Sequence, residues 1–563
     1  MIRKVFSFLY HNFSIVVIVG AFAAACVGIL TYRSHEAPPG AITIRMAHWQ
    51  LETSVRDGLI ELAADYRKEV NPNVYVVQEA IPESVYAQWV CSQLMGGTGP
   101  DLMETGGGGV PPYTWLSFYG RYFVPLTRDV MRANPYNKGT DLEGVSLNRT
   151  YYDNMISGYV EEHQEYMGFP LSQFVIRMFY NRDLLKRLTG LDSAPTNYRA
   201  FLAACEKIRG QKDRTGKPFI PFVLSQTHQG LVETYMWDLP TYGALRRCDF
   251  NRDGWAGNDE VFVAMKSGLL TMRYPGYEAK FKMIADMLPN FPPGFTGLGR
   301  DEGVFFFAQE RAVFIPAGTW DCKSLMDQAK GKFNIGLMDF PAPDKTDPVF
   351  GPYMEGPKFD RPSVGFRFGL TRTSKHKEEA LDFLYYLASR KKNEKLNRII
   401  GWIPAIKGAE MVDFLQGWTP HLTGVYGAFN YNMGGETGIK WTQLFSLYLT
   451  GQTSYEKMIA EFEPFYFKRG LIDFKEAKRN WRRGMLVNEQ FLAGVRSRAL
   501  LASSGDAELQ WLKYRALTVG RQLWPEISYF RQMQMVDQPP GAVTNGPYEY
   551  SPLVMTKLRA TLR

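Results

Sequence analysis

The chain has 563 residues, more than a single hydrophobic core usually supports, so at least two domains are expected. Hydrophobic residues make up 45% and charged residues 22% of the sequence, which excludes a disordered chain and a protein with many membrane spans. The net charge of +8 is spread along the sequence, so no nucleic-acid partner is expected.

The N-terminus carries Arg3 and Lys4, followed by an uncharged apolar run over residues 14–30. Crossing a bilayer takes about 20 residues, so this run fits either a cleaved signal sequence or a membrane anchor. Cys26 follows three alanines, as in a lipoprotein signal, but the leucine usual at the third position before the cysteine is absent. Apolar residues continue to Leu30, which favours an uncleaved anchor. We therefore expect residues 1–34 to be a signal anchor or transmembrane helix that holds an exported protein at the periplasmic face of the inner membrane.

The exported part opens with alternating strands and helices. Residues 41–48 and 74–78 read as strands, and an amphipathic helix over 55–70 joins them. This pattern predicts a βαβ unit with a parallel sheet. A helix over 83–94 and a third strand over 99–104 extend the same layer.

The segment 168–181 has the pattern of an extended crossing between two packed layers. It is apolar, β-branched and aromatic after Pro170, and Asn181 is a capping residue ahead of a helix start. A further helix is expected over 198–208.

Four segments in this order resemble the extracellular solute-binding proteins of ABC transporters, in the sugar-binding group related to the maltodextrin-binding proteins. They are Gly-Pro-Asp-Leu at 99–102, the crossing at 168–181, the element at 305–320 that ends in Gly-Thr-Trp, and the run from 364 to 404 with Ser-Lys-His-Lys-Glu-Glu-Ala and Gly-Trp-Ile-Pro. Glu310-Arg311 stands where the family more often has Gly-Lys. Ser374 is expected to cap the helix that follows it. The resemblance covers about residues 41–470.

The resemblance implies an α/β fold of the periplasmic-binding-protein type, in which two lobes enclose an interlobe ligand cleft. Residues 35–470 would form the two interleaved lobes, with chain crossings near 168–181, 312–321 and 362–370. It also implies an exported protein that captures a carbohydrate by lobe closure and delivers it to the permease subunits of an ABC transporter, without catalysis.

Ligands of open parallel sheets bind at the carboxyl ends of the strands, so residues just after strands are the cleft candidates. Tryptophan would stack on sugar rings and planar polar groups would bind hydroxyls, because a polyol needs both. The expected ligand-binding residues are Trp49, Gln50, Glu104, Gln173, Trp320, Asp321 and Phe366.

Residues 249–260 fit the calcium-loop pattern D-x-[DN]-x-[DN]-G-x5-E in full. Oxygen ligands would come from the side chains of Asp249, Asn251, Asp253 and Glu260 and from the backbone carbonyl of Trp255. Pro240 argues against a helix-loop-helix hand, so the expectation is an isolated structural Ca²⁺ site that leads into a helix over 260–270. An acidic turn closed by its own hydrogen bonds is the alternative.

No catalytic signature of a zinc protease, a serine hydrolase or a P-loop enzyme is present in the sequence, and no organic cofactor is expected. Glu104 and Asp321 could form the carboxylate pair of a glycan-processing enzyme, which is the weaker alternative. A ligand-sensing receptor for a signalling membrane partner would share every cleft residue and is the other alternative.

The resemblance fades beyond residue 470, and residues 471–563 are expected to form a helical C-terminal extension. Two helices are predicted over 473–501 and 507–535. The first is rich in lysine and arginine, which indicates a solvated face or, as the less frequent alternative, contact with anionic lipid.

Overall fold

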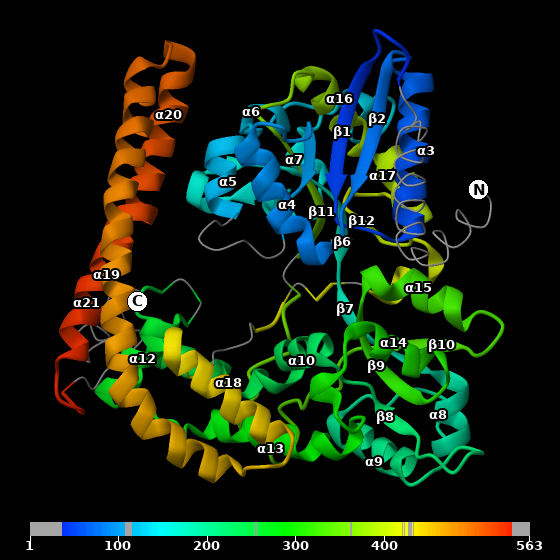
Figure 1. The fold of residues 1–563 in the computed structure, drawn as a ribbon, viewed down its shortest axis with the longest axis vertical. Helices are drawn as coiled ribbons and strands as arrows, with labels where there is room; N and C mark the ends of the chain where they lie inside the picture. Colours follow the sequence, from blue (N-terminus) through cyan, green and yellow to red (C-terminus); the bar gives the residue numbers. More distant parts are fainter. Residues whose placement is uncertain are drawn as a thin grey trace, which may run out of the picture.

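The computed structural model describes residues 37–106, 115–252, 254, 256–360, 363–418, 420–421, 423–425, 431 and 433–542. They form two α/β lobes stacked one above the other, with a long helical hairpin along one side (Figure 1). The fold class expected from the sequence is confirmed for the two lobes. The expected anchor over residues 14–30 lies outside the described part of the chain.

Lobe 1 is built on a six-stranded sheet in the order β12-β6-β11-β3-β1-β2. β1 pairs in parallel with both β2 and β3, whereas β11 runs antiparallel to β3 and β6. The predicted βαβ unit is therefore present. The strand bounds are β1 Ile42–His48, β2 Val74–Ala80, β3 Leu102–Glu104, β6 Phe169–Phe174, β11 Ser363–Leu370 and β12 Ile403–Pro404.

Helices cover both faces of this sheet (Figure 1). One face packs on helices whose buried residues include Leu59, Leu62, Phe383 and Leu396, and the other on helices that bury Tyr86, Val90 and Phe118. The covering helices are α3 Thr53–Glu69, α16 Lys377–Leu387 and α17 Arg390–Ile400 on the first face and α4 Glu83–Gly96 and α5 Trp115–Tyr122 on the second. Smaller elements complete the lobe: α6 Thr127–Val130, α7 Leu147–Thr150, β4 Tyr159–Val160 and β5 Glu165–Tyr166.

Lobe 2 contains a four-stranded sheet in the order β10-β7-β9-β8. Its largest apolar cluster includes Trp237, Phe262, Phe281 and Phe314. The strands are β7 Ile176–Asn181, β8 Ile220–Phe222, β9 Ala312–Gly318 and β10 Ile335–Met338. The helices are α8 Arg182–Thr189, α9 Tyr198–Arg209, α10 Gln226–Val232, α11 Leu245–Cys248, α12 Asn258–Ser267, α13 Pro275–Met287, α14 Arg300–Ala308 and α15 Thr319–Ala329.

The chain passes between the lobes where the sequence predicted its main crossing. β6 of the upper sheet continues into β7 of the lower sheet, and Val175 alone lies between them. β11 carries the chain back to lobe 1 as expected near 362–370. The passage expected near 312–321 is instead internal to lobe 2, because β9 pairs with β7 and β8 and is followed by α15 on the same sheet.

Of the two helix caps that the sequence predicted, Asn181 is confirmed and Ser374 is wrong. The side chains of Asn181 and Asn197 accept hydrogen bonds from the amides of Leu184 and Ala200 and so cap α8 and α9. Ser374 does not cap α16: His376 holds that position. The hydroxyl of Ser374 donates instead to Asp101 Oδ1 at 2.6 Å and accepts from the His376 amide. The helix expected over 260–270 is α12, which begins two residues earlier.

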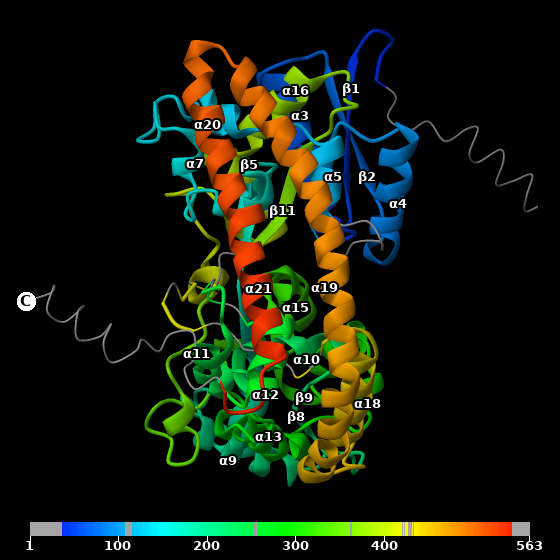
Figure 2. The same cartoon turned by 90° about the vertical axis from the view of Figure 1, so that its left-hand side faces the viewer.

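The C-terminal extension is a pair of antiparallel helices that stands beside both lobes (Figures 1 and 2). After α18 (Gly435–Leu449), α19 runs from Tyr455 to Leu501 without a break at residue 470. The chain then turns into α20 (Ser504–Thr518), a π-helical turn (Val519–Leu523) and α21 (Trp524–Val536). We call the segment from α19 to α21 the hairpin. The first predicted helix is thus longer than expected.

Candidate ligand site

Lobe 1 presents three of the expected residues together, at the carboxyl ends of β1 and β3. Glu104 is fully buried, and its Oε1 accepts a hydrogen bond from Gln50 Nε2 at 2.7 Å. Its Oε2 accepts from the backbone amide of Trp49 at 3.2 Å. The indole of Trp49 lies edge-on against Tyr86, with ring centroids 5.1 Å apart. An aromatic platform and a planar amide are therefore held side by side.

Burial in this setting raises the pKa of Glu104 to about 8, although the hydrogen bonds from Gln50 and Trp49 act to lower it. A carboxyl group held this way can carry or release a proton near neutral pH. It also fixes the orientation of the Gln50 side chain, because Gln50 is itself mostly buried.

On lobe 2, Asp321 forms an ion pair with Arg300 at the starts of α15 and α14. Burial raises the pKa of Asp321, and the neighbouring Arg300 acts to lower it. Glu52, which precedes α3 on lobe 1, acts electrostatically on both residues. Charged groups of the two lobes thus lie within electrostatic range of one another.

The other three expected residues have structural partners. Trp320 packs edge-on against Phe174 of the crossing strand, with centroids 5.4 Å apart. Gln173 Nε2 donates to the carbonyl of Pro404 at 3.2 Å. Phe366 is 1% exposed and packs on Trp402 and Phe368 in the lobe 1 core. The structure therefore brings Trp49, Gln50 and Glu104 together but does not gather all seven.

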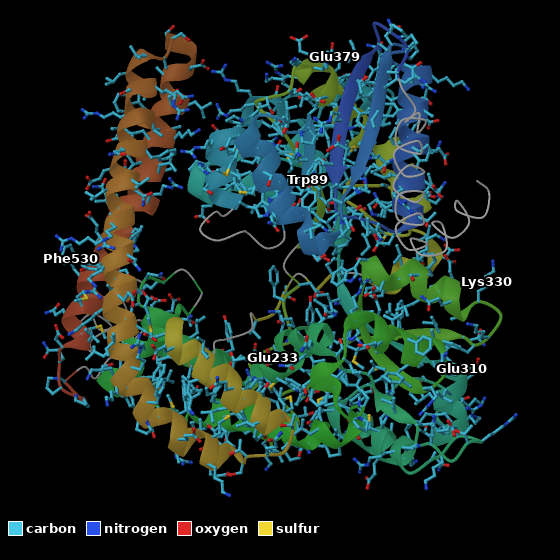
Figure 3. The ribbon with its side chains drawn as sticks, in the orientation of Figure 1. Trp89, Glu233, Glu310, Lys330, Glu379 and Phe530 are labelled. Carbon is cyan, nitrogen blue, oxygen red and sulfur yellow. The ribbon has the colours of Figure 1, made fainter. Side chains whose placement is uncertain are left out.

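A cavity of about 690 Å³ opens in lobe 2, at the sheet end where β10 stops and β7 begins. Two of its aromatic rings, Tyr235 and Phe340, are stacked with centroids 5.1 Å apart and planes 25° apart. Glu233, just before Tyr235, lies on the edge of lobe 2 that faces lobe 1 (Figure 3). The wall also contains charged groups, among them Arg177, Asp339, Lys358 and His421.

Arg177 organises the charged side of this cavity. It is 2% exposed and donates two hydrogen bonds to Asp360, of which the shorter is 2.7 Å, and its Nε lies 2.8 Å from Asp339. His421 Nε2 lies 3.0 Å from the same Asp339 carboxylate. Because a buried arginine is costly unless it is paired, this network fixes the planar guanidinium in place.

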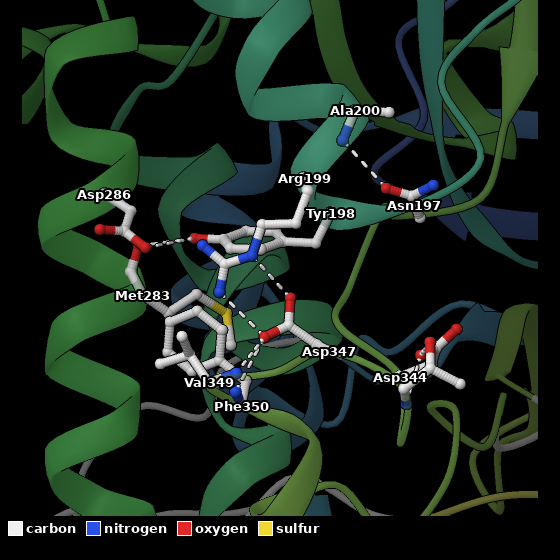
Figure 4. Close-up of polar contacts among 11 residues, drawn as sticks. Asn197, Tyr198, Arg199, Ala200, Met283, Asp286, Asp344, Asp347, Val349 and Phe350 are labelled. Atoms are coloured by element: carbon white, nitrogen blue, oxygen red, sulfur yellow. Dashed lines mark hydrogen bonds and ion pairs between the residues drawn. The ribbon is translucent and has the colours of Figure 1, made fainter.

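An ion pair holds the loop that carries the cavity wall. Arg199 at the start of α9 binds Asp347 through two hydrogen bonds of 2.8 and 2.9 Å (Figure 4). Asp347 also accepts from the amides of Val349 and Phe350. Burial acts to raise the pKa of Asp347, but the bond from Arg199 and these amides outweigh it, so the pKa lies below its usual value.

The sequence reasoning missed this cavity. One signal was available: Arg177 is the only charged residue in the apolar strand over 176–181. Phe340 and Lys358 lie in irregular segments and Tyr235 lies in a short π-helical turn, so no periodic pattern marks them.

The loop expected to bind calcium closes on hydrogen bonds to its own backbone. Glu260 accepts from the amides of Asn251 and Gly257, both at 3.0 Å, and Asp249 accepts from the amide of Gly254 at 3.1 Å. Burial raises the pKa of Glu260 to about 8. Asp253 and Trp255 lie outside the described residues. Within the described part of the chain, no group of three or more His, Cys, Asp or Glu is arranged to hold a metal ion.

Of the helices between residues 37 and 542 that the structure describes, none is both long and apolar enough to cross a membrane.

Two α/β lobes joined by the direct connection from β6 to β7 define a class of two-lobe α/β proteins. The chain belongs to the family of bacterial extracellular solute-binding proteins, whose model matches residues 61–420. The multiple sugar-binding protein of Streptococcus mutans is 20% identical over 407 residues, which cover 71% of this chain and 83% of that protein.

Solved structures share the fold. The apo form of RafE from Streptococcus pneumoniae is 18% identical, with a TM-score of 0.51, and the match covers 77% of this chain and 99% of that one. Maltose-bound MalE3 of T. maritima is 16% identical, with a TM-score of 0.51, over 75% of this chain and 98% of that one.

Proposed function

We propose that this protein is an exported receptor that binds a carbohydrate between its two lobes and delivers it to the permease of an ABC transporter. The observation that supports this most directly is the chemistry of the two facing lobes. Lobe 1 offers the Trp49 indole beside the Gln50 amide, and lobe 2 offers the stacked Tyr235 and Phe340 beside the Arg177 network. Flat apolar rings next to fixed planar hydrogen-bonding groups suit a polyol.

The names of similar proteins point the same way. The Streptococcus mutans relative is a multiple sugar-binding protein, and one structural neighbour was solved with raffinose. The names of both proteins describe binding of a ligand, and the family is one of solute-binding proteins. Binding without turnover is consistent with the two candidate acids, because Glu104 is bonded to Gln50 and Asp321 to Arg300.

In this proposal the ligand contacts both lobes and so stabilises a closed arrangement over an open one. The connection between β6 and β7 would be the hinge. The apolar run over residues 14–30 would tether the receptor to the inner membrane, close to its permease.

The test is thermal unfolding of the full-length protein in detergent against a panel of mono- and oligosaccharides. A ligand present at 100 times its dissociation constant stabilises the folded state by about 2.7 kcal/mol, which raises the Tm clearly. We expect at least one saccharide to raise the Tm and to be recovered chemically unchanged. Consumption of the sugar would support the enzyme instead, and a panel without any shift would refute the carbohydrate assignment.

A matched pair of variants ties the signal to the cleft. Trp49→Ala should abolish or weaken the shift, whereas Trp524→Ala, at a half-exposed position of the hairpin, should leave it unchanged. If both variants respond to the sugar like the wild type, the ligand binds elsewhere.

A further inference from the structure

The base of the hairpin is part of lobe 2. Met458, Phe462, Tyr466 and Phe474 of α19 are fully buried in the main apolar cluster of that lobe. Met535 and Val536 at the end of α21 join the same cluster, and Lys478 binds Asp259 of α12 at 2.5 Å. Because apolar burial on this scale is not broken by a small rotation, the hairpin moves with lobe 2.

The upper part of the hairpin reaches lobe 1 through polar contacts. Lys513 of α20 forms an ion pair with Glu165 of β5, and the two side chains are 13% and 14% exposed. Arg128 of α6 pairs with Asp506, and His163 lies edge-on to Phe491 with centroids 6.0 Å apart. The described attachment to lobe 1 therefore consists of two ion pairs and one aromatic contact, whereas the attachment to lobe 2 is an apolar core.

The remaining surface between the hairpin and lobe 1 is a groove. It has a volume of about 680 Å³ and lies between α20 and the segment that contains α6 and β5. Leu509 and Leu512 line it from the hairpin, and both are about half exposed. Lobe 1 therefore has room to move against α20 once the ion pairs open.

We propose that the hairpin is a latch between the lobes: its ion pairs to lobe 1 stabilise the lobe arrangement seen here, and a ligand that rotates the lobes must break them. This proposal rests on the proposed function, since it concerns the regulation of the same cleft. The hairpin stands on the side of the molecule away from the β6–β7 hinge (Figure 1). A rotation about that hinge therefore displaces Glu165 and Arg128 relative to the hairpin, and the pairs cannot persist in both arrangements.

The latch sets an energetic threshold for closure. A ligand shifts the equilibrium only by its differential affinity for the two arrangements, so every contact that favours one of them changes the apparent affinity. Because ion pairs weaken in salt, the latch is expected to loosen as ionic strength rises.

The test measures the distance between the lobes without any ligand. Spin labels are placed at Glu379→Cys, at the top of lobe 1, and at Lys330→Cys, at the outer edge of lobe 2 (Figure 3), in full-length protein with Cys26 and Cys91 replaced by serine. Double electron–electron resonance then gives the distance distribution. Lys513→Met combined with Arg128→Ala should broaden or shift this distribution, and about 1 M salt should do the same to the wild type.

Two controls make the result specific. Lys475→Met combined with Arg479→Ala removes two exposed charges from α19 and should leave the distribution unchanged. The reversed pair Arg128→Asp with Asp506→Arg keeps an ion pair and should behave like the wild type. A latch variant whose distribution equals that of the wild type, or a reversed pair as broad as the latch variant, would overturn the proposal.

With a saccharide identified, the latch variant should bind it with a dissociation constant changed by about 5-fold or more, a typical size for coupling between sites. The ligand-free distances test the latch even if no sugar binds, so its failure and that of the carbohydrate assignment remain distinguishable.

Discussion

Glu104 and Gln50, 54 positions apart in the sequence, are joined by a hydrogen bond of 2.7 Å in a fully buried setting. The parallel pairing of β1 with β3 brings them together, because both residues lie at the carboxyl ends of neighbouring strands. Because burial raises the pKa of the Glu104 carboxyl group, the stability of lobe 1 depends on the pH.

We expect Glu104→Gln to change the pH dependence of stability. The folded-state pKa of Glu104, about 8, lies above its unfolded value near 4.5, so the folded state binds more protons between these values. The contribution of Glu104 to wild-type stability should therefore fall as the pH rises from about 5 to 8, and the variant should lose this contribution. The similar contribution of Glu260, whose pKa is also raised to about 8, should remain in the variant. Chemical denaturation at about pH 5, 6.5 and 8 measures it, with the exposed Glu378→Gln as the control. Parallel curves for Glu104→Gln and wild type would show that Glu104 is ionised throughout.

Arg177→Met should destabilise the protein by about 3–5 kcal/mol, because it leaves Asp360 buried without its partner. Arg246→Met is the matched control: its pair with Glu355 is largely exposed and is worth about 1 kcal/mol or less. Urea unfolding distinguishes the two. Equal losses would mean that the Arg177 network contributes no more than a surface pair.

If the loop over residues 249–260 binds calcium, Ca²⁺ should raise the Tm, and more so at alkaline pH. The pKa of Glu260 is raised to about 8. Below that pH Ca²⁺ competes with a proton for the Glu260 carboxyl group, whereas above it the group is already ionised and binds the metal more tightly. Thermal unfolding at about pH 6 and pH 9, with Ca²⁺ or a chelator, gives the comparison. Glu260→Gln should remove the Ca²⁺ effect, and the exposed Glu456→Gln serves as the control. If Ca²⁺ does not change the Tm of the wild type at either pH, the loop is an acidic turn and not a calcium site.

Asp347→Asn should lower the free energy of unfolding at neutral pH by about 1–3 kcal/mol, since it weakens the two hydrogen bonds from Arg199 and the hydrogen bonds from two backbone amides. The pKa of Asp347 is depressed, so this contribution is present above the ordinary aspartate pKa and is lost as the pH falls through the folded value. The gap between variant and wild type should therefore close in acid. If the difference in stability between variant and wild type persists at about pH 2, the destabilisation comes from altered packing and not from the ionised carboxylate.

The sequence predicts more of the fold than of the site. The periodicity of residues 41–104 and the capping residue Asn181 predicted elements correctly, because strand alternation and capping are local properties. Ser374 shows the limit: its hydroxyl bonds to Asp101, 273 positions away, and no local pattern reveals such a partner. Trp320 and Phe366 illustrate the same point, since an aromatic residue after a strand can pack inward as well as face a ligand.

The hairpin was foreseen as two helices but not as a bridge between the lobes. α19 begins at Tyr455, well before the predicted start at residue 473, and it continues through Pro464. Phe462 and Tyr466, on either side of this proline, are buried in lobe 2. Contacts such as Lys513 with Glu165 join residues 348 positions apart, and only the tertiary arrangement reveals them.

The continuity of α19 also limits how the gene can be shortened. A chain that ends at residue 470 would cut this helix in its middle and strip Phe474, Met535 and Val536 from the wall of lobe 2. A minimal expressed fragment therefore has to retain the chain through residue 536, even if transport needs only the two lobes.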